Sequence, residues 1–372
     1  MHDESNGFHP GHLPSGEARR IASLPRGGPQ AHSHRPRIGL LSTSGCLRDG
    51  GWPVYAGDAA TVHAIFEAGG SPVLIPTLPI VLGGYDPFAI LTDEDGFDDV
   101  FSVLWQTICS LDGLALAGGG DVYSCFYGQV VHPQAGPPDL WRDLWERYFA
   151  LAARRLQMPT LGIGRGMHVM NMACGGGLVQ DIRAQWPKKT MPPLLRHQAR
   201  GRRISADNRV EHPVTIHPKS RLASIFRNRD DLPARQSIAA VPSQHHQSVG
   251  YITPEAEIVG YLAPELVVGA TAPDGVIEAI EDPSSASFWI AVQFHPEWVV
   301  HLGWAQRLFA SFTGASLAYA NQMPRLTSQH EEVRAWLRRF DAGSSSRQAD
   351  EQVDMPLARQ NQEAEAYAQA TA

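Results

Sequence analysis

The residues best placed for chemistry follow a short apolar segment, Thr160–Ile163, that predicts a buried strand. Gly164, Arg165 and Gly166 come next, and the residues after them are compatible with a helix. This order of strand, turn and helix is typical of a nucleophile elbow, in which a strained turn exposes one side chain above the edge of a sheet. The start of the following helix directs free N–H groups and the positive end of its dipole toward developing negative charge. The segment therefore predicts a site for acyl-transfer chemistry.

A second candidate follows the strand predicted over Phe288–Phe294, where His295, Pro296 and Glu297 stand together. A histidine can act as a general base, and a carboxylate can orient its ring. On its own, this short motif would more often simply end a strand with a surface acid. Its place after a long apolar strand and downstream of the elbow favours the remains of a catalytic triad.

The elbow resembles that of the class I glutamine-amidotransferase-like superfamily, most closely its γ-glutamyl amide hydrolase branch (peptidase C26-like), which includes γ-glutamyl-γ-aminobutyrate hydrolases. The family pattern is Gly-Ile-Cys-Arg-Gly-x-Gln, followed by an Asn and a glycine-rich Gln-Asp-Ile. The matching residues are Gly162, Ile163, Arg165, Gly166, Asn171, Gly175, Gly176, Gln180, Asp181 and Ile182. Two positions differ: Gly164 stands where the family has its nucleophilic Cys, and His168 where it has Gln. Because glycine has no side chain to attack a carbonyl, the covalent mechanism is lost unless another group replaces the thiol.

Further segments extend the resemblance over about residues 37–320. They are Ala68–Pro76, Leu111–Val122 with Tyr127-Gly128, Ser243–Gln247, Asp274–Ala279 and Val292–Glu297. One departure is Pro242, where the family usually has Asn. The ordered set of motifs makes the resemblance far more specific than the elbow alone.

The resemblance assigns a role to each candidate site residue. It implies that His295 is the general base and Glu297 its orienting carboxylate. It implies an oxyanion hole lined by backbone N–H groups of Gly118, Gly119, Gly120 and Arg165. The remaining candidates for ligand contact are His168, His245, His246 and Gln247. No metal and no organic cofactor is expected, and the expected ligand is a small γ-glutamyl amide or a glutamine-like molecule.

Simpler interpretations stand beside these roles. His168 falls in the first turn of its helix, where a packed or capping histidine is more common than a ligand contact. His245 and His246 are expected to brace the wall of the site through hydrogen bonds. The glycines at 118–120 could form a plain turn or a phosphate cradle. Because the sequence has neither a Walker lysine at the right spacing nor a GxGxxG after its first strand, nucleotide binding is disfavoured.

None of the four cysteines falls at the elbow. Cys174 lies ten residues beyond Gly164, about 15 Å along a helix, which is too far to replace the missing thiol. Cys109 has apolar neighbours and is expected in the core. Cys46 follows the first predicted strand, Cys125 follows the predicted oxyanion loop, and both could approach the rim of the site. Ser42, Thr43 and Ser44 near the same rim are weaker candidates. We expect none of them to be the nucleophile, because catalysis also needs a hydrogen bond to the base.

Composition excludes several classes of protein. The 372 residues include 31 basic and 38 acidic ones, a balance that gives no electrostatic footprint for nucleic acid or an anionic membrane. No apolar run is long enough to span a membrane, and residues 1–5 carry no apolar signal core. The cysteines are widely spaced without a CxxC pair, which favours reduced thiols. A cytoplasmic protein is expected, and a homo-oligomer or a protein partner is left open.

The chain divides into three parts by composition. Residues 1–36 are rich in Gly, Pro and His and predict a disordered leader, whose five irregularly spaced histidines lack a metal-ligand signature. Residues 37–324 form the predicted glutamine-amidotransferase-like domain. Residues 325–372 predict a short helix and a polar, disordered tail.

The elements of the central part alternate between strand and helix. Strands are predicted over Arg37–Ser42, Pro72–Pro76, Leu114–Ala117 and Thr160–Ile163, and helices over Asp58–Ala68, Asp98–Leu111, Asp139–Leu156 and Gly303–Ala318. After residue 200 come mostly strand-like pieces, within 214–217, 237–241, 258–262, 267–272, 276–281 and 288–294. Continuously apolar strands that alternate with helices indicate a parallel sheet covered on both faces. The predicted fold is α/β, with the three layers of the flavodoxin-like class I glutamine amidotransferase fold and an added antiparallel portion.

The sequence leaves three functions open. The first is a catalytically degenerate hydrolase-like protein that keeps a γ-glutamyl-ligand pocket for binding, regulation or scaffolding. The second is an active γ-glutamyl amide hydrolase, either an engineered Cys-to-Gly variant or an enzyme that uses water or another nucleophile with His295 and Glu297. The third, a subunit that passes ammonia to a synthase, needs a working glutaminase and is disfavoured.

Overall fold

The computed structural model describes residues 35–46, 53–77, 94–189, 191–199, 209–226, 237–254, 257–321 and 329–338. The leader predicted over 1–36 and the tail predicted after the short helix lie almost wholly outside these ranges. Within the ranges, no helix is both long enough and apolar enough to cross a membrane.

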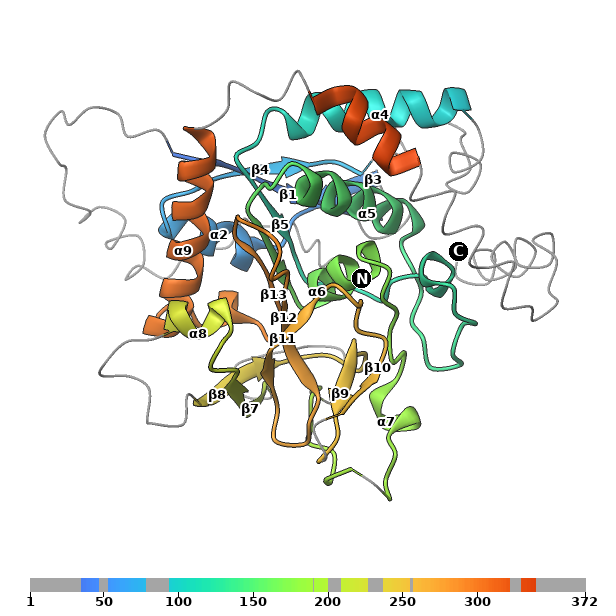
Figure 1. Ribbon diagram of the computed structural model, residues 1–372, viewed down its shortest axis with the longest axis vertical. Coiled ribbons are helices and arrows are strands. Elements are labelled where there is room, and N and C mark those ends of the chain that lie inside the picture. The colour runs from blue at the N-terminus through green and yellow to red at the C-terminus, as the bar shows by residue number, and fades with distance from the viewer. Residues whose placement is uncertain are drawn as a thin grey trace, which may run out of the picture. The chain divides into compact units, whose positions relative to one another are not determined.

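A nine-stranded sheet forms the centre of the described chain (Figure 1). Along the sheet the order is β4 (Ser71–Ile75), β1 (Arg37–Leu41), β5 (Gly113–Leu116), β6 (Thr160–Ile163), β13 (Trp289–Val292), β12 (Ile277–Glu281), β11 (Val267–Thr271), β7 (Val210–Ile216) and β8 (Ser237–Ser243). Two antiparallel pairs lie outside it: β2 (Thr43–Cys46) with β3 (Pro53–Ala56), and β9 (Gly250–Ile252) with β10 (Ile258–Gly260).

The sheet has a parallel half and an antiparallel half. Strands β4, β1, β5, β6 and β13 pair in parallel, whereas β12, β11, β7 and β8 continue the sheet by antiparallel pairing. At the centre, β6 and β13 lie side by side with Ile163 opposite Val292. Because parallel strands end at the same edge, the turn after β6 and the segment after β13 are brought together there.

Helices cover both faces of the sheet (Figure 1). On one side are α4 (Glu94–Ile108), α5 (Leu140–Arg155) and α6 (Arg165–Ala173). On the other are α2 (Ala59–Glu67), α8 (Arg221–Phe226) and α9 (Gly303–Ala320). The short elements are α7 (Ile182–Gln185) and the 3₁₀ turns η2 (Ser124–Tyr127) and η3 (Pro296–Val299). A further helix over residues 330–338 lies beside α4, where Arg334 pairs with Asp98 at 2.6 Å.

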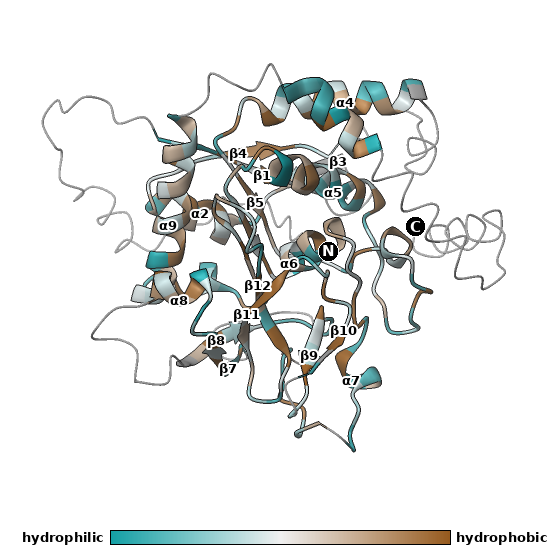
Figure 2. Cartoon of the chain, viewed as in Figure 1, coloured by the Kyte–Doolittle hydropathy of each residue, from teal (hydrophilic) through white to brown (hydrophobic). Residues whose placement is uncertain are grey.

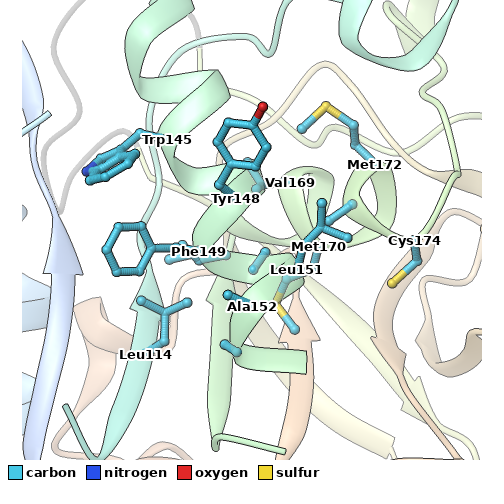
Figure 3. Close-up of a cluster of buried hydrophobic side chains, with 14 of the residues drawn as sticks. Leu114, Trp145, Tyr148, Phe149, Leu151, Ala152, Val169, Met170, Met172 and Cys174 are labelled. Atoms are coloured by element: carbon cyan, nitrogen blue, oxygen red, sulfur yellow. The ribbon is translucent and has the colours of Figure 1, made fainter. Parts of the chain in front are cut away.

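Each central strand contributes to two cores. On β5, Leu114 and Leu116 pack under α5 and α6, whereas Ala115 packs on the opposite face of the sheet. Figure 3 shows the first core, in which Leu114 lies below the aromatic residues of α5 and the side chains of α6. In Figure 2 the central strands β4 and β5 are largely brown, and α4 and α5 carry both brown and teal residues. Both strand faces are apolar, which explains why these strands read as continuous apolar runs.

The α/β class, the parallel core and the antiparallel addition are as predicted. The prediction for β6 is correct to the residue, and helices α2 and α5 are capped by Asp58 and Asp139 as their sequences indicate. The helix predicted over Asp98–Leu111 is wrong in its bounds, since α4 runs over Glu94–Ile108. The ring centroid of buried Phe97 lies 6.1 Å from that of Tyr148 on α5. This packing stabilises the first turn of α4, which contains the weak helix former Gly96.

Candidate active site

The turn between β6 and α6 has the geometry of a nucleophile elbow. Gly164 caps α6 with φ of +56° and ψ of −112°, a left-handed conformation that L-residues rarely adopt. Its N–H donates to the Val292 carbonyl at 2.8 Å, and its carbonyl accepts from the Met167 N–H at 3.0 Å. The turn is therefore fixed between β13 and the first turn of α6, with glycine at its strained residue.

His295 lies directly beside Gly164. A Cβ atom built on Gly164 would be 3.1 Å from Cε1 of His295 and 3.3 Å from its Nε2 atom, and the next nearest atom is Cα of Gly118 at 3.7 Å. Any side chain on residue 164 would therefore meet the Nε2 edge of this imidazole. The structure brings together the turn, the histidine and the first glycine of the loop after β5.

The ring of His295 is held by two neighbours in its own turn. Its Nδ1 atom lies 2.6 Å from Oε1 of Glu297, and both side chains are buried. Because a carboxylate only accepts hydrogen bonds, Nδ1 carries the proton, and Nε2 is left as the basic atom of the neutral ring. Trp298 stacks on the imidazole at 4.1 Å between ring centroids with an interplanar angle of 6°. The sequence reasoning did not single out Trp298, although its place directly after the motif is a usable signal.

The loop after β5 is held by a hydrogen bond from Arg142 of α5. Nη2 of Arg142 donates to the Gly118 carbonyl at 3.0 Å. A Cβ atom on Gly118 would lie 3.1 Å from Cε1 of His295, and one on Gly119 would overlap Nη1 of Arg142. A Cβ atom is thus tightly contacted at residue 118 and would force Arg142 to move at residue 119, whereas the nearest atom to a Cβ atom on Gly120 is the Pro137 carbonyl oxygen at 3.7 Å.

A buried charge network supports both the loop and the elbow. The Arg165 guanidinium pairs with Asp143 and with Glu146, and Glu146 also accepts from Nε of Arg142 at 2.8 Å. All four side chains are buried. Burial raises the pKa of Asp143 to about 6, and the nearby Arg165 partly offsets this effect. The sequence singled out Arg165 for its backbone N–H; the structure adds that its side chain ties α6 to α5.

His168 is a packed histidine in this structure. It is 4% exposed, and its Nε2 atom lies 2.8 Å from Oε1 of Gln293, two residues before His295. Burial lowers its pKa to about 4, although the hydrogen bond to Gln293 acts in the opposite direction. The side chain therefore links α6 to the segment after β13 as a neutral ring.

This burial predicts an acid-sensitive fold. The folded pKa of His168, about 4, lies below the value of about 6.5 for an unfolded histidine, so the unfolded chain binds more protons between these values. Stability should fall by up to about 3 kcal/mol as pH drops from about 6.5 to 4. We expect His168→Gln, whose amide can still donate to Gln293, to lose less over this range. Urea unfolding at several pH values measures the difference, and identical pH profiles for the two proteins would contradict it.

The loop after β8 is fixed at several points. His246 bridges two carboxylates, with Nε2 3.0 Å from Asp121 and Nδ1 3.2 Å from Asp181. The hydrogen bond to Asp121 raises the pKa of His246. His245 Nδ1 lies 2.9 Å from the Gln247 carbonyl, and the buried Gln247 amide has no hydrogen-bond partner within the described part of the chain. His246 and His245 thus point to different surroundings: His246 contacts the loop after β5, and His245 joins a buried group with His197, His212 and Glu278.

The three cysteines whose side chains the structure describes do not supply a nucleophile near the elbow. No sulfur is among the three atoms nearest a Cβ on Gly164. Burial raises the pKa of Cys109 and of Cys125, and raises that of Cys174 to about 12, so none of these thiols is activated. The side chains of Cys46 and Ser44 lie outside the described residues. Ser42 is fully buried, where its hydroxyl accepts from the Thr77 N–H at 3.3 Å.

The sheet order, the elbow after β6 and the His295–Glu297 pair define a class I glutamine-amidotransferase-like domain. The model of the peptidase C26 family matches residues 98–297, and the chain belongs to this family. The matched range contains the elbow and ends at Glu297.

Two relatives in sequence support the same assignment. The chain is 34% identical over 292 residues to the "Putative glutamine amidotransferase" of Mycobacterium tuberculosis. The alignment covers 77% of this chain and 77% of the relative. It is 28% identical over 237 residues to the protein NtpR of Enterococcus hirae, covering 63% of this chain and 79% of the relative. Among solved structures, the glutaminase domain of Trypanosoma brucei CTPS aligns at 15% identity with a TM-score of 0.42, covering 76% of this chain and 94% of that one.

Proposed function

We propose that this chain is a catalytically degenerate member of its family, one that binds a γ-glutamyl amide or a glutamine-like molecule without cleaving it through a covalent intermediate. One observation carries the proposal. Gly164 occupies the strained turn, and a side chain there would begin 3.3 Å from the basic Nε2 atom of His295. The resemblance in sequence gives Cys at this position. The base and its carboxylate remain, but the atom they would activate is absent.

The missing step can be stated chemically. In a Cys-His-Glu hydrolase, the thiolate attacks the γ-carbonyl carbon, the C–N bond breaks, and the imidazolium gives its proton to the leaving amine. Water then hydrolyses the thioester. Glycine supplies no electron pair for the first bond, so none of the later steps can follow. Orientation of His295 by Glu297 and Trp298 does not compensate, because these groups act on a nucleophile that must be present.

The parts that would hold a ligand are retained. We assign oxyanion binding to backbone N–H groups of Arg165, at the start of α6, and of the loop Gly118–Gly120, which Arg142 fastens through the Gly118 carbonyl. A ligand carbonyl placed there would lie beside Gly164 and His295. The proposed role is therefore recognition of the γ-glutamyl group, for regulation or scaffolding, rather than turnover.

Binding without turnover is the expected result for the purified full-length protein. Calorimetry with L-glutamine and with γ-glutamyl-p-nitroanilide should show saturable binding, while p-nitroaniline release stays at the rate without protein. His295→Ala should weaken binding, and His63→Ala, a change at an exposed histidine of α2, should not. The absence of any binding by the wild type would contradict the proposal.

An active hydrolase makes the opposite prediction. The intact His295–Glu297 pair favours this alternative, because the space next to Nε2 could admit a water molecule as the nucleophile. Robust release of p-nitroaniline by the wild type that His295→Ala abolishes would establish it. Release that survives His295→Ala would point instead to a contaminating enzyme, and would leave the calorimetry to decide on binding.

A further inference from the structure

Four buried side chains meet beside the antiparallel half of the sheet. Figure 1 shows two strands of that half, β7 and β8, in its lower part. The four residues are His197, His212 on β7, His245 after β8, and Glu278 on β12. One ligand atom from each lies within 4.8 Å of the other three. Oε1 of Glu278 is 3.3 Å from Nδ1 of His197, 3.6 Å from Nε2 of His212 and 3.5 Å from Nε2 of His245. Four segments that are distant in sequence thus direct nitrogen and oxygen atoms at one point.

In each histidine, the ring nitrogen that does not face Glu278 lies within hydrogen-bond distance of an acceptor oxygen. His197 Nε2 lies 2.8 Å from Oδ2 of Asp274, and His245 Nδ1 lies 2.9 Å from the Gln247 carbonyl. His212 Nδ1 lies 3.2 Å from the Pro213 carbonyl. Carbonyl and carboxylate oxygens only accept, so each outer nitrogen carries a proton, and in the neutral form of each ring the inner nitrogen presents a lone pair. This is the arrangement of outer contacts that orients histidine ligands around a metal.

The facing atoms have no hydrogen-bond partner among the described residues. Nδ1 of His197, Nε2 of His212, Nε2 of His245 and both carboxylate oxygens of Glu278 are buried and unsatisfied. With all three rings neutral, the three lone pairs and the carboxylate cannot stabilise one another, because all of them are electron-rich. Burial makes such an arrangement costly unless a positive charge lies between them.

We propose that these four residues bind a divalent transition-metal ion of the zinc class. Imidazole nitrogen and carboxylate oxygen are usual zinc ligands, and four ligands at about 2.0–2.1 Å from a tetrahedral ion are about 3.3–3.4 Å apart. The separations from Glu278 to the three nitrogens, 3.3, 3.5 and 3.6 Å, are close to that value. All four positions are filled by protein, which is typical of a structural rather than a catalytic zinc site. The proposal departs from the expectation, drawn from the sequence, that no metal is needed.

The ion would hold the wall of the candidate active site. His245 is followed by His246, which contacts Asp121 on the loop after β5. The segment that carries His197 is already attached to the end of β8 and the loop after it. The His197 carbonyl accepts from the His245 N–H at 2.8 Å and from the Ser243 hydroxyl at 2.9 Å. The metal would add a link from the loop after β8 to β7 and β12. A protonated histidine in place of the ion is the competing explanation.

Metal content of the untagged full-length protein tests the site directly. After growth with added zinc and extensive dialysis, elemental analysis should find about one zinc per chain beyond that in the His212→Gln/Glu278→Gln double variant. The histidines at 2, 9, 12, 32 and 34 are the same in both proteins and contribute an equal background. His217→Gln, a half-buried histidine just after β7, is the matched control and should retain the metal.

Two measurements on the wild type need no variant that could fail to fold. Removing the ion with a chelator should lower the melting temperature, and adding Zn²⁺ back should restore it. Co²⁺ added to the metal-free protein should give the intense visible absorption of a tetrahedral site. Zinc content equal in wild type and double variant, or a melting temperature that neither chelator nor Zn²⁺ changes, would overturn the proposal and favour the protonated histidine.

Discussion

The Gly164→Cys variant should hydrolyse γ-glutamyl-p-nitroanilide at least about 10²-fold to 10³-fold faster than the wild type. The reason is geometric: the Cβ atom of the new side chain begins 3.3 Å from Nε2 of His295, so a thiol on it can reach the base. Glu297 already fixes the tautomer of the ring, at 2.6 Å. The thiol would transfer its proton to Nε2, attack the γ-carbonyl carbon and release the amine. Steady-state release of p-nitroaniline measures the gain.

The same change should cost stability. Residue 164 has a φ of +56°, and a Cβ atom would be 3.1 Å from Cε1 of His295, so the ring must move by a few tenths of an ångström. A side chain in such a conformation costs about 1–3 kcal/mol. We expect Gly164→Ala to show the same loss of stability with no gain in activity, because it adds the Cβ atom without the thiol. Alanine is therefore the matched control for strain.

Two further variants decide what a gain or its absence means. If His295 is the base, the Gly164→Cys/His295→Ala variant should lose the acquired activity. If Gly164→Cys folds but stays inert, changing His168 to Gln in the same protein tests whether that departure from the family pattern has altered the site. A Gly164→Cys/His168→Gln variant that folds but stays inert would contradict the assignment of Gly164 to the nucleophile position.

Loss of the Arg165 guanidinium should have the largest effect on stability. We expect Arg165→Met to lower the free energy of unfolding by about 3–5 kcal/mol, because it leaves the buried carboxylates of Asp143 and Glu146 without this cation. Arg142 would still contact Glu146 at 2.8 Å, but Asp143 would lose its contact with Arg165. Urea unfolding at neutral pH measures the loss.

A matched change on the neighbouring helix α5 separates burial from charge. Arg155, near the end of α5, pairs with Glu332, and these side chains are 39% and 52% exposed. Arg155→Met should therefore cost no more than about 1 kcal/mol. Equal losses for Arg155→Met and Arg165→Met would mean that the network between α5 and α6 does not support the elbow in the way we describe.

The parallel half of the fold could be predicted because its strands and helices carry their own signals. Strand β6 is a short apolar run buried on both faces, and α5 begins at the capping residue Asp139. The hairpin of β2 and β3 was missed, because Thr43–Cys46 is too short and too polar to read as a strand. The start of α4 was missed because it depends on the packing of Phe97, a contact that local periodicity does not contain.

The residues of the candidate site also fall into those that local motifs predict and those that only the fold brings together. Gly164 and His295 lie in local motifs, and the sequence predicted both. The buried group around Glu278 could not be predicted, because its ligands come from four segments with no regular spacing between His197, His212 and His245. Only the return of β7, β12 and the loop after β8 to one place in the sheet reveals it.

The most direct measurement is the mass of the protein during turnover. Full-length Gly164→Cys, mixed with γ-glutamyl-p-nitroanilide and quenched in acid, should carry one γ-glutamyl group as a thioester, and peptide mapping should locate it between Ile163 and Arg165. The wild type should carry none on any of its four cysteines. A γ-glutamyl adduct on a cysteine of the wild type would contradict the conclusion that this chain holds the site of an amide hydrolase without its nucleophile.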